Sequence, residues 1–155
     1  MTIRTVAVAV GPDDEKRAES LATAAIEVAG GAEAVVVLLH VFTESAYEEG
    51  VREAGYDPED PPPAHTLASR LQAVDAIAAL LEAAGVEHRV RGEVGDEPEG
   101  ILRGAEAVGA DRLLIGGRRR SPTGKAVFGS TAHRVLMNAG CPVTFVRDGA
   151  SAGDE

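Results

Sequence analysis

The chain has 155 residues, a length that suits one domain, and 25 acidic against 15 basic side chains give it a net charge of −10. Such a surface repels nucleic acid and anionic membranes, and no apolar run approaches the ~20 residues that span a bilayer. The single cysteine, Cys141, excludes an internal disulfide and a thiolate metal cluster, so we expect a cytoplasmic protein, and the acidity is typical of a halophilic source.

The first part of the chain alternates apolar runs with a helical segment. Residues 5–10 are rich in valine and bounded by Gly11-Pro12, which predicts a buried strand. Asp13 is placed to cap the following helix, which is expected to run to Gly30-Gly31. Residues 35–42 form the next strand. Because both strands are apolar almost throughout, we expect parallel strands that are covered on both faces.

An acidic segment follows at residues 43–65, where Pro61-Pro62-Pro63 exclude one continuous helix. We expect a long loop there, with room for one short helix before Gly55. Residues 66–84 then place their apolar side chains on one helical face, and Gly85 ends that helix.

The rest of the chain continues the alternation. Residues 86–91 alternate apolar and charged side chains, which predicts a strand at an edge of the sheet. A helix from Pro98 to about Val108, a buried strand at 113–115, a helix from about Ala126 to Asn138 and a last strand at 142–146 follow. The domain is expected to cover residues 1–148, with a disordered tail at 149–155.

Five strands alternating with four helices predict an α/β fold. We expect a single doubly wound, five-stranded parallel sheet in the order 3-2-1-4-5, with helices on both faces. Ligands bind such sheets at the carboxyl ends of the strands, where the winding reverses. The acidic segment leaves the same end of the sheet, so it is positioned to fold over a bound ligand as a lid.

Glycines and cations gather after the strand at 113–115. Gly116-Gly117 is followed by Arg118, Arg119, Arg120 and Lys125, and then by Gly129-Ser130-Thr131 at the start of a helix. Glycines allow the backbone to approach a ligand, and the free N–H groups at a helix start bind anions. The segment therefore predicts a phosphate cradle, with a solvated basic loop as the alternative. A P-loop is excluded, because its first glycine would fall on Arg119 and Ala126 lacks the hydroxyl that binds Mg²⁺.

The spacing of Gly116, Gly129 and Ser130 resembles the glycine signature of ATP-binding universal stress proteins. The resemblance covers about residues 3–147 and is to a haloarchaeal-like member of that family. It implies an adenine nucleotide alpha hydrolase-like fold, a homodimer through the last strand, and a stress-response regulator rather than an enzyme. Two positions depart from the family pattern: Arg119 replaces the second glycine, and Gly11 stands where an aspartate often follows the first strand.

Charge indicates how ATP or another adenine nucleotide would lie, because acids after the first strand repel phosphates. The base and ribose are then expected near Gly11, Pro12, Asp13 and Val41, and the phosphates near Gly116, Arg119, Gly129, Ser130 and Thr131. Arg119 either clamps a phosphate or fills the space that the ligand needs. His40 and Cys141 are expected to be packing residues, and no catalytic residue or metal site is predicted. A nucleotide-free dimeric interaction protein and a weak ATP hydrolase remain open as alternatives.

Overall fold

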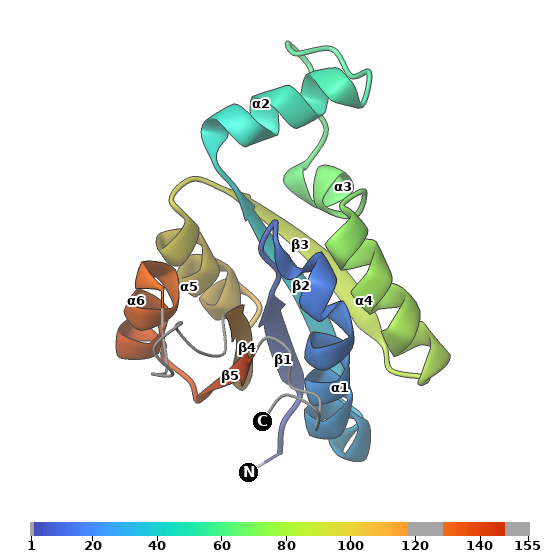
Figure 1. Ribbon diagram of the computed structural model, residues 1–155, viewed down its shortest axis with the longest axis vertical. Helices are drawn as coiled ribbons and strands as arrows, with labels where there is room; N and C mark the ends of the chain where they lie inside the picture. The colour runs from blue at the N-terminus through green and yellow to red at the C-terminus, as the bar shows by residue number, and fades with distance from the viewer. Residues whose placement is uncertain (1, 118–128, 148–155) are drawn as a thin grey trace.

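The computed structural model describes residues 2–117 and 129–147. Its strands form one all-parallel sheet in the order β3-β2-β1-β4-β5, which confirms the predicted order (Figure 1). The strands are β1 (Thr5–Ala9), β2 (Val35–Phe42), β3 (His88–Val94), β4 (Arg112–Gly117) and β5 (Val143–Arg147). The α-helices are α1 (Ala18–Ala29), α2 (Glu44–Glu53), α3 (Ala64–Ala68), α4 (Gln72–Ala83), α5 (Glu97–Ala107) and α6 (Ser130–Asn138), and two short 3-10 helices are η1 (Asp14–Arg17) and η2 (Gly30–Ala32).

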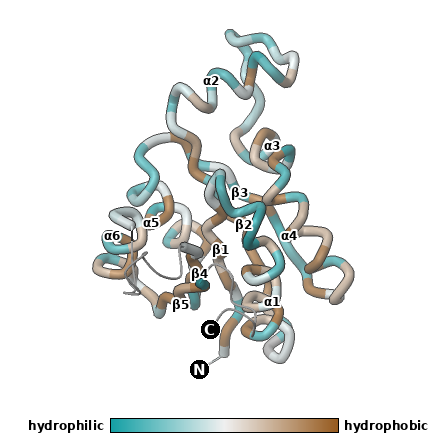
Figure 2. Tube along the Cα trace, in the orientation of Figure 1, coloured by the Kyte–Doolittle hydropathy of each residue, from teal (hydrophilic) through white to brown (hydrophobic). Residues whose placement is uncertain are grey.

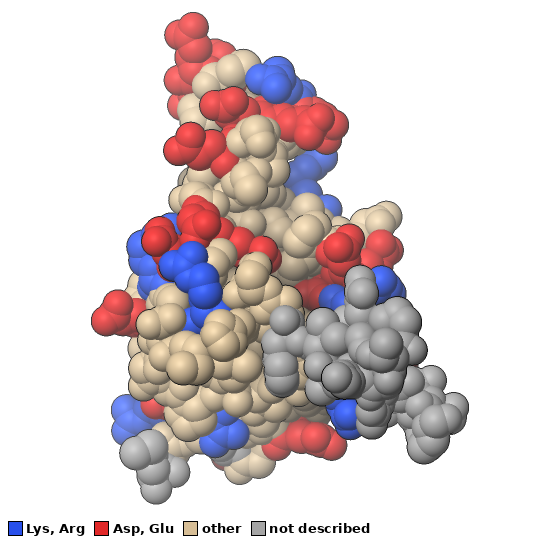
Figure 3. Space-filling model, turned by 60° about the vertical axis from the view of Figure 1, so that its left-hand side comes forward, with Lys and Arg blue, Asp and Glu red and all other residues tan. Residues whose placement is uncertain are grey.

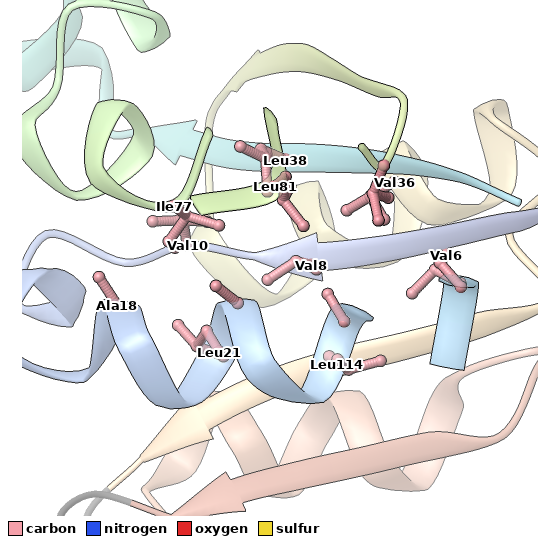
Figure 4. Close-up of a cluster of buried hydrophobic side chains, with 14 of the residues drawn as sticks. Val6, Val8, Val10, Ala18, Leu21, Val36, Leu38, Ile77, Leu81 and Leu114 are labelled. Atoms are coloured by element: carbon pink, nitrogen blue, oxygen red, sulfur yellow. The ribbon is translucent and has the colours of Figure 1, made fainter. Parts of the chain in front are cut away.

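The core consists of one layer on each face of the sheet, because successive strand residues point to opposite sides. Val6 and Val8 of β1 pack with Leu21 of α1 and Ile77 of α4 on one face (Figure 4). Ala7 and Ala9 and their neighbours pack with α5 and α6 on the other face. Hydropathy follows this arrangement, with brown along the central strands and teal over much of α2 (Figure 2). Burial on both faces explains the continuous apolar runs of β1 and β2.

Helix α5 lies unusually close to β2, and two glycines allow it. A Cβ on Gly100 would lie 2.6 Å from Cγ1 of Val41, and a Cβ on Gly104 would lie 2.6 Å from Cδ1 of Leu39. Real Cβ atoms do not approach carbon so closely, so any side chain at either position would push the helix away from the sheet. This contact places the first turn of α5 beside the carboxyl end of β1.

The expected helix at residues 66–84 is wrong, because the structure contains two helices separated by a turn. Helix α3 ends at Ala68 and α4 begins at Gln72. The start of α3 is pressed against β3, since a Cβ on Gly92 would lie 2.5 Å from the backbone of Ala64. At the other end of α3, the hydroxyl of Ser69 donates to the carbonyl oxygen of His65 at 2.9 Å. Such a local bond competes with helix continuation, and the apolar periodicity does not reveal it.

Other element boundaries also differ from those expected. Strand β3 covers residues 88–94 rather than 86–91, but it does lie at an edge of the sheet, as predicted. Asp13 does not cap the first helix, because its side chain makes no cap hydrogen bond, and the chain enters α1 through η1. Helix α6 begins at Ser130, and the part of the expected helix at 126–128 lies outside the described residues, as do Arg119 and the tail.

The acidic segment does contain the short helix expected before Gly55. Thr43 caps α2, its hydroxyl oxygen accepting from the backbone N–H of Ala46 at 3.1 Å. The hydroxyl of Tyr47 donates to the carbonyl oxygen of Pro62, and Val51 packs on Phe42. The segment projects from the body of the molecule (Figure 1), and acidic side chains crowd this projecting end (Figure 3). Among the described helices, none has both the length and the apolar character needed to cross a bilayer.

Candidate functional site

A cavity of about 490 Å³ opens where β1 and β4 end, the point at which the winding of the sheet reverses. Seven of the residues selected from the sequence line it: Gly11, Pro12, Asp13, Val41, Gly116, Gly129 and Thr131. Ser130 is not among the lining residues, and Arg119 lies outside the described residues. None of residues 43–65, all of which are described, lines the cavity, so α2 does not cover it as the expected lid.

The β1 side of the cavity is a tight turn stabilised by Asp14. The backbone N–H of Gly11 donates to Oδ2 of Asp14 at 2.7 Å, and the backbone N–H of Asp14 donates to the carbonyl oxygen of Gly11 at 3.2 Å. The other carboxylate oxygen of Asp14 is paired with Nη1 of Arg17. Asp14 is 5% exposed and Arg17 is 9% exposed, whereas Asp13 is exposed. The sequence analysis selected Asp13 as the acid of the site, whereas in the structure Asp14 is the acid whose side chain stabilises the turn.

The opposite side is formed by the end of β4 and the start of α6. A Cβ on Gly116 would lie 2.7 Å from Cδ of Arg17, so this glycine makes room for the arginine side chain. Gly129 precedes α6 and has no side chain to cap the helix, and within the described residues no side-chain cap is formed there. Among the described residues, none has an atom within 4 Å of a Cβ built on Gly129.

A carboxylate from α5 reaches across the cavity. Glu97 is the first residue of α5, after Asp96, whose side chain caps the helix. Its Oε1 accepts from the hydroxyl of Thr131 at 3.2 Å, and its Oε2 lies 3.7 Å from the Cβ position of Gly11. Sequence reasoning missed Glu97, because an acid in the first turn of a helix is already explained by the helix dipole. Nothing in the sequence places it beside a residue 34 positions away.

His40 supports the Gly11 turn from within the sheet. It is 5% exposed, its Nδ1 lies 2.7 Å from the carbonyl oxygen of Val10, and its ring meets that of Phe42 edge-on at 4.5 Å. A carbonyl oxygen only accepts, so Nδ1 carries the proton. Burial lowers the pKa of His40, although the Val10 carbonyl and the charges of Glu97 and Asp14 oppose that shift. The sequence-based prediction of a core or rim histidine is confirmed. Cys141, expected to be buried, is half-buried instead.

The family comparison agrees with this arrangement. The model of the universal stress protein family matches residues 2–147. The chain belongs to the universal stress protein family. A curated universal stress protein from Mycolicibacterium smegmatis is 37% identical over 75 residues, which are 48% of this chain, and the chain spans 58% of the length of that relative.

Solved structures of universal stress proteins share the fold. One from Archaeoglobus fulgidus superposes with a TM-score of 0.68 at 27% identity, covering 93% of this chain and 98% of the other. A universal stress protein in complex with cAMP gives 0.62 at 20% identity, covering 96% and 99%. A universal stress protein from A. fulgidus in complex with dAMP gives 0.62 at 24% identity, covering 95% and 100%. Because the last two structures are less than 25% identical to this chain, they show a shared fold and nothing further.

The described lining of the cavity combines charged and apolar side chains. Within residues 2–117 and 129–147, no three His, Cys, Asp or Glu side chains gather as a metal site requires. The described lining contains three carboxylates, from Asp13, Asp14 and Glu97, and the guanidinium of Arg17. Apolar side chains such as Val41 and Ile101 supply the rest of the wall.

Proposed function

We propose that this universal stress protein is a regulatory protein that binds an adenine nucleotide in the cavity at the ends of β1 and β4. The observation that carries the proposal is the coincidence of this cavity with the residues of the family's glycine signature, Gly116 and Gly129. Its volume of about 490 Å³ lies in the usual range for small-molecule sites. The solved complexes of other universal stress proteins with cAMP and dAMP support the choice of nucleotide class.

In this proposal the base and ribose lie against Gly11, Pro12, Asp13 and Val41. The phosphate lies toward Gly116, Gly129 and the first turn of α6, with Ser130 and Thr131. Three features support this orientation: the apolar wall at Val41, the acids on the β1 side, and the uncapped N–H groups at the start of α6. ATP is one member of the ligand class, and Arg119, outside the described residues, remains part of the proposed phosphate set.

Filling the cavity tests the proposal. Gly129→Val adds a side chain at a residue that lines the cavity, where a Cβ meets no atom of the described residues within 4 Å, so it should narrow the cavity. Gly31→Val is the matched control, because its Cβ is equally unobstructed and it lies outside the cavity. Calorimetry with AMP, cAMP and ATP should show binding to the wild type and to Gly31→Val, and loss of about tenfold or more in Gly129→Val. Failure of the wild type to bind any of the three contradicts the proposal, as does unchanged binding by Gly129→Val.

The second candidate function is that of a nucleotide-free dimeric interaction protein. Glu97 favours it, because its carboxylate accepts the hydrogen bond of the Thr131 hydroxyl, which is proposed to contact a phosphate.

Under both candidate functions, we propose that the protein forms a homodimer through β5. That strand is at an edge of the sheet with Val143 and Phe145 half-buried, and Met137 on the adjacent α6 is 70% exposed. An exposed apolar edge favours pairing with a second copy. Light scattering at micromolar concentration in molar potassium chloride should give the mass of a dimer, and the mass of a monomer would contradict this part of the proposal.

A further inference from the structure

Arg17 is a buried cation in the wall of the cavity. It is the last residue of η1 and is 9% exposed. A buried charge is costly unless it is paired, and here Nη1 pairs with Oδ1 of Asp14, itself 5% exposed. The second oxygen of Asp14 accepts from the backbone N–H of Gly11 at 2.7 Å. The guanidinium is therefore tied, through one carboxylate, to the turn that forms the β1 side of the cavity.

The same side chain contacts the β4 side. A Cβ on Gly116 would lie 2.7 Å from Cδ and 3.6 Å from Nε of Arg17, and 3.4 Å from Oδ1 of Asp14. The ion pair thus lies between the two loops that flank the reversal point of the sheet, and both of its members line the cavity. Glycine at position 116 makes this placement possible, because any side chain there would displace the arginine.

The charges of the cavity lining indicate what Arg17 could bind. Among the described residues that line the cavity, Arg17 carries the positive charge, and Asp13, Asp14 and Glu97 carry negative charge. The carboxylates repel an anion, whereas a guanidinium matches the oxygens of a phosphate with a planar fork of donors. A guanidinium has five N–H donors, so one arginine is able to serve several acceptors at the same time.

We propose that Arg17 binds the phosphate of the nucleotide and that Asp14 is the positioning residue that holds the guanidinium at Gly116. This inference rests on the proposed nucleotide function and adds to it a residue that neither the glycine spacing nor the basic loop of the sequence indicates. It predicts that Arg17 discriminates between a nucleotide and its nucleoside, because adenosine has no phosphate for the guanidinium to bind.

The experiment compares AMP with adenosine by calorimetry in wild type, Arg17→Gln, Arg17→Lys and Asp14→Asn. Arg17→Gln should weaken AMP binding about tenfold or more, the scale of a charge-assisted hydrogen bond, with adenosine within about twofold of wild type. The AMP affinity of Arg17→Lys should lie between those of the wild type and Arg17→Gln, because lysine keeps the positive charge but lacks the planar set of N–H donors. Asp14→Asn should also weaken AMP binding, by less than Arg17→Gln does, because the guanidinium itself is kept. Arg134→Gln is the control, since this exposed arginine of α6 does not line the cavity.

Removing Arg17 alone leaves Asp14 buried without it, which destabilises the fold. The double variant Arg17→Gln/Asp14→Asn puts two neutral amides in place of the ion pair, so no buried charge is left alone, and circular dichroism verifies its folding. It should lose more affinity for AMP than for adenosine. Equal losses for AMP and adenosine, in a folded variant, would indicate a structural role and overturn the inference, as would unchanged AMP binding.

Pyrophosphate, used as a separate probe, distinguishes failure of this inference from failure of the proposed function. If the wild type binds pyrophosphate but none of AMP, cAMP and ATP, and the Arg17 variants lose pyrophosphate, then Arg17 stands as a phosphate-binding residue and the nucleotide function is wrong. If the wild type binds adenosine and AMP and the variants bind AMP equally well, then the function stands and the inference is wrong. If the wild type binds none of these probes, both are wrong.

Discussion

Replacing Gly100 by alanine should destabilise the protein, although the same change stabilises most helices. Gly100 is inside α5 and faces Val41, and an alanine Cβ would lie 2.6 Å and 2.8 Å from the two methyl groups of that valine and 3.3 Å from its Cβ. Valine is branched at Cβ and has restricted rotamers, so it cannot turn both methyl groups aside. Helix α5 must therefore move away from β2, and it carries Glu97 and Ile101 of the cavity wall with it.

Two opposing effects set the change in the free energy of unfolding caused by Gly100→Ala. Alanine is favoured over glycine in a helix by about 1 kcal/mol. Overpacking a close contact costs about 1–3 kcal/mol, and three contacts this short belong in the upper half of that range. The net effect is a loss of about 1–2 kcal/mol, which for a domain of this size lowers Tm by roughly 2–8 °C.

Gly50 of α2 is the matched control for this prediction. Its Cβ would lie 3.6 Å from Cδ1 of Leu67, an ordinary van der Waals contact. Gly50→Ala should therefore gain the helix propensity of alanine without the cost of overpacking, and raise the free energy of unfolding by up to about 1 kcal/mol. Urea denaturation and thermal melts followed by circular dichroism measure both variants. A Tm for Gly100→Ala at or above that of the wild type would refute the reasoning, as would an equal fall in Gly50→Ala.

Three further predictions concern charge. Because burial lowers the pKa of His40 below its ordinary 6.5, the unfolded chain binds more protons below that pH, and stability should fall as the pH drops from neutral to about 5. His40→Asn should reduce this fall in urea titrations at several pH values, and an unchanged dependence would contradict the assignment. With a net charge of −10, Tm should rise between ~0.1 M and ~1 M potassium chloride, where the screening length shortens to about 3 Å; a constant Tm would remove the halophile proposal. Glu97→Gln should strengthen AMP binding by roughly threefold or more without affecting adenosine, because it removes a negative charge beside Thr131; calorimetry showing equal or weaker AMP binding would contradict this.

The sheet could be predicted from the sequence because burial on both faces requires continuous apolar runs. Residues 5–10 and 35–42 have such runs, and the strand order followed from chain alternation and right-handed crossovers. The break between α3 and α4 could not be predicted in this way. It accompanies a contact between Gly92 and the backbone of Ala64, and Gly92 itself looks like the end of a strand when only local sequence is considered.

The residues of the site also divide into those that a sequence pattern indicates and those that only the folded structure brings together. Gly11, Gly116 and Gly129 were found because glycine spacing and topology both select the ends of β1 and β4. Asp14 and Arg17 were missed because their roles depend on the 3-10 turn η1, which brings two residues three positions apart into one ion pair.

The projection formed by α2 offers a graft point for protein engineering. It is anchored to the body by the small apolar cluster of Phe42, Val51, Leu67 and Ala68, and it contributes no side chain to the cavity wall. At its far end, the backbone N–H of Asp60 donates to the carbonyl oxygen of Asp57 in an exposed turn. Exposed turns with polar side chains tolerate added sequence. We therefore expect a fluorescent domain spliced between Asp57 and Asp60 to leave both the sheet and the cavity intact.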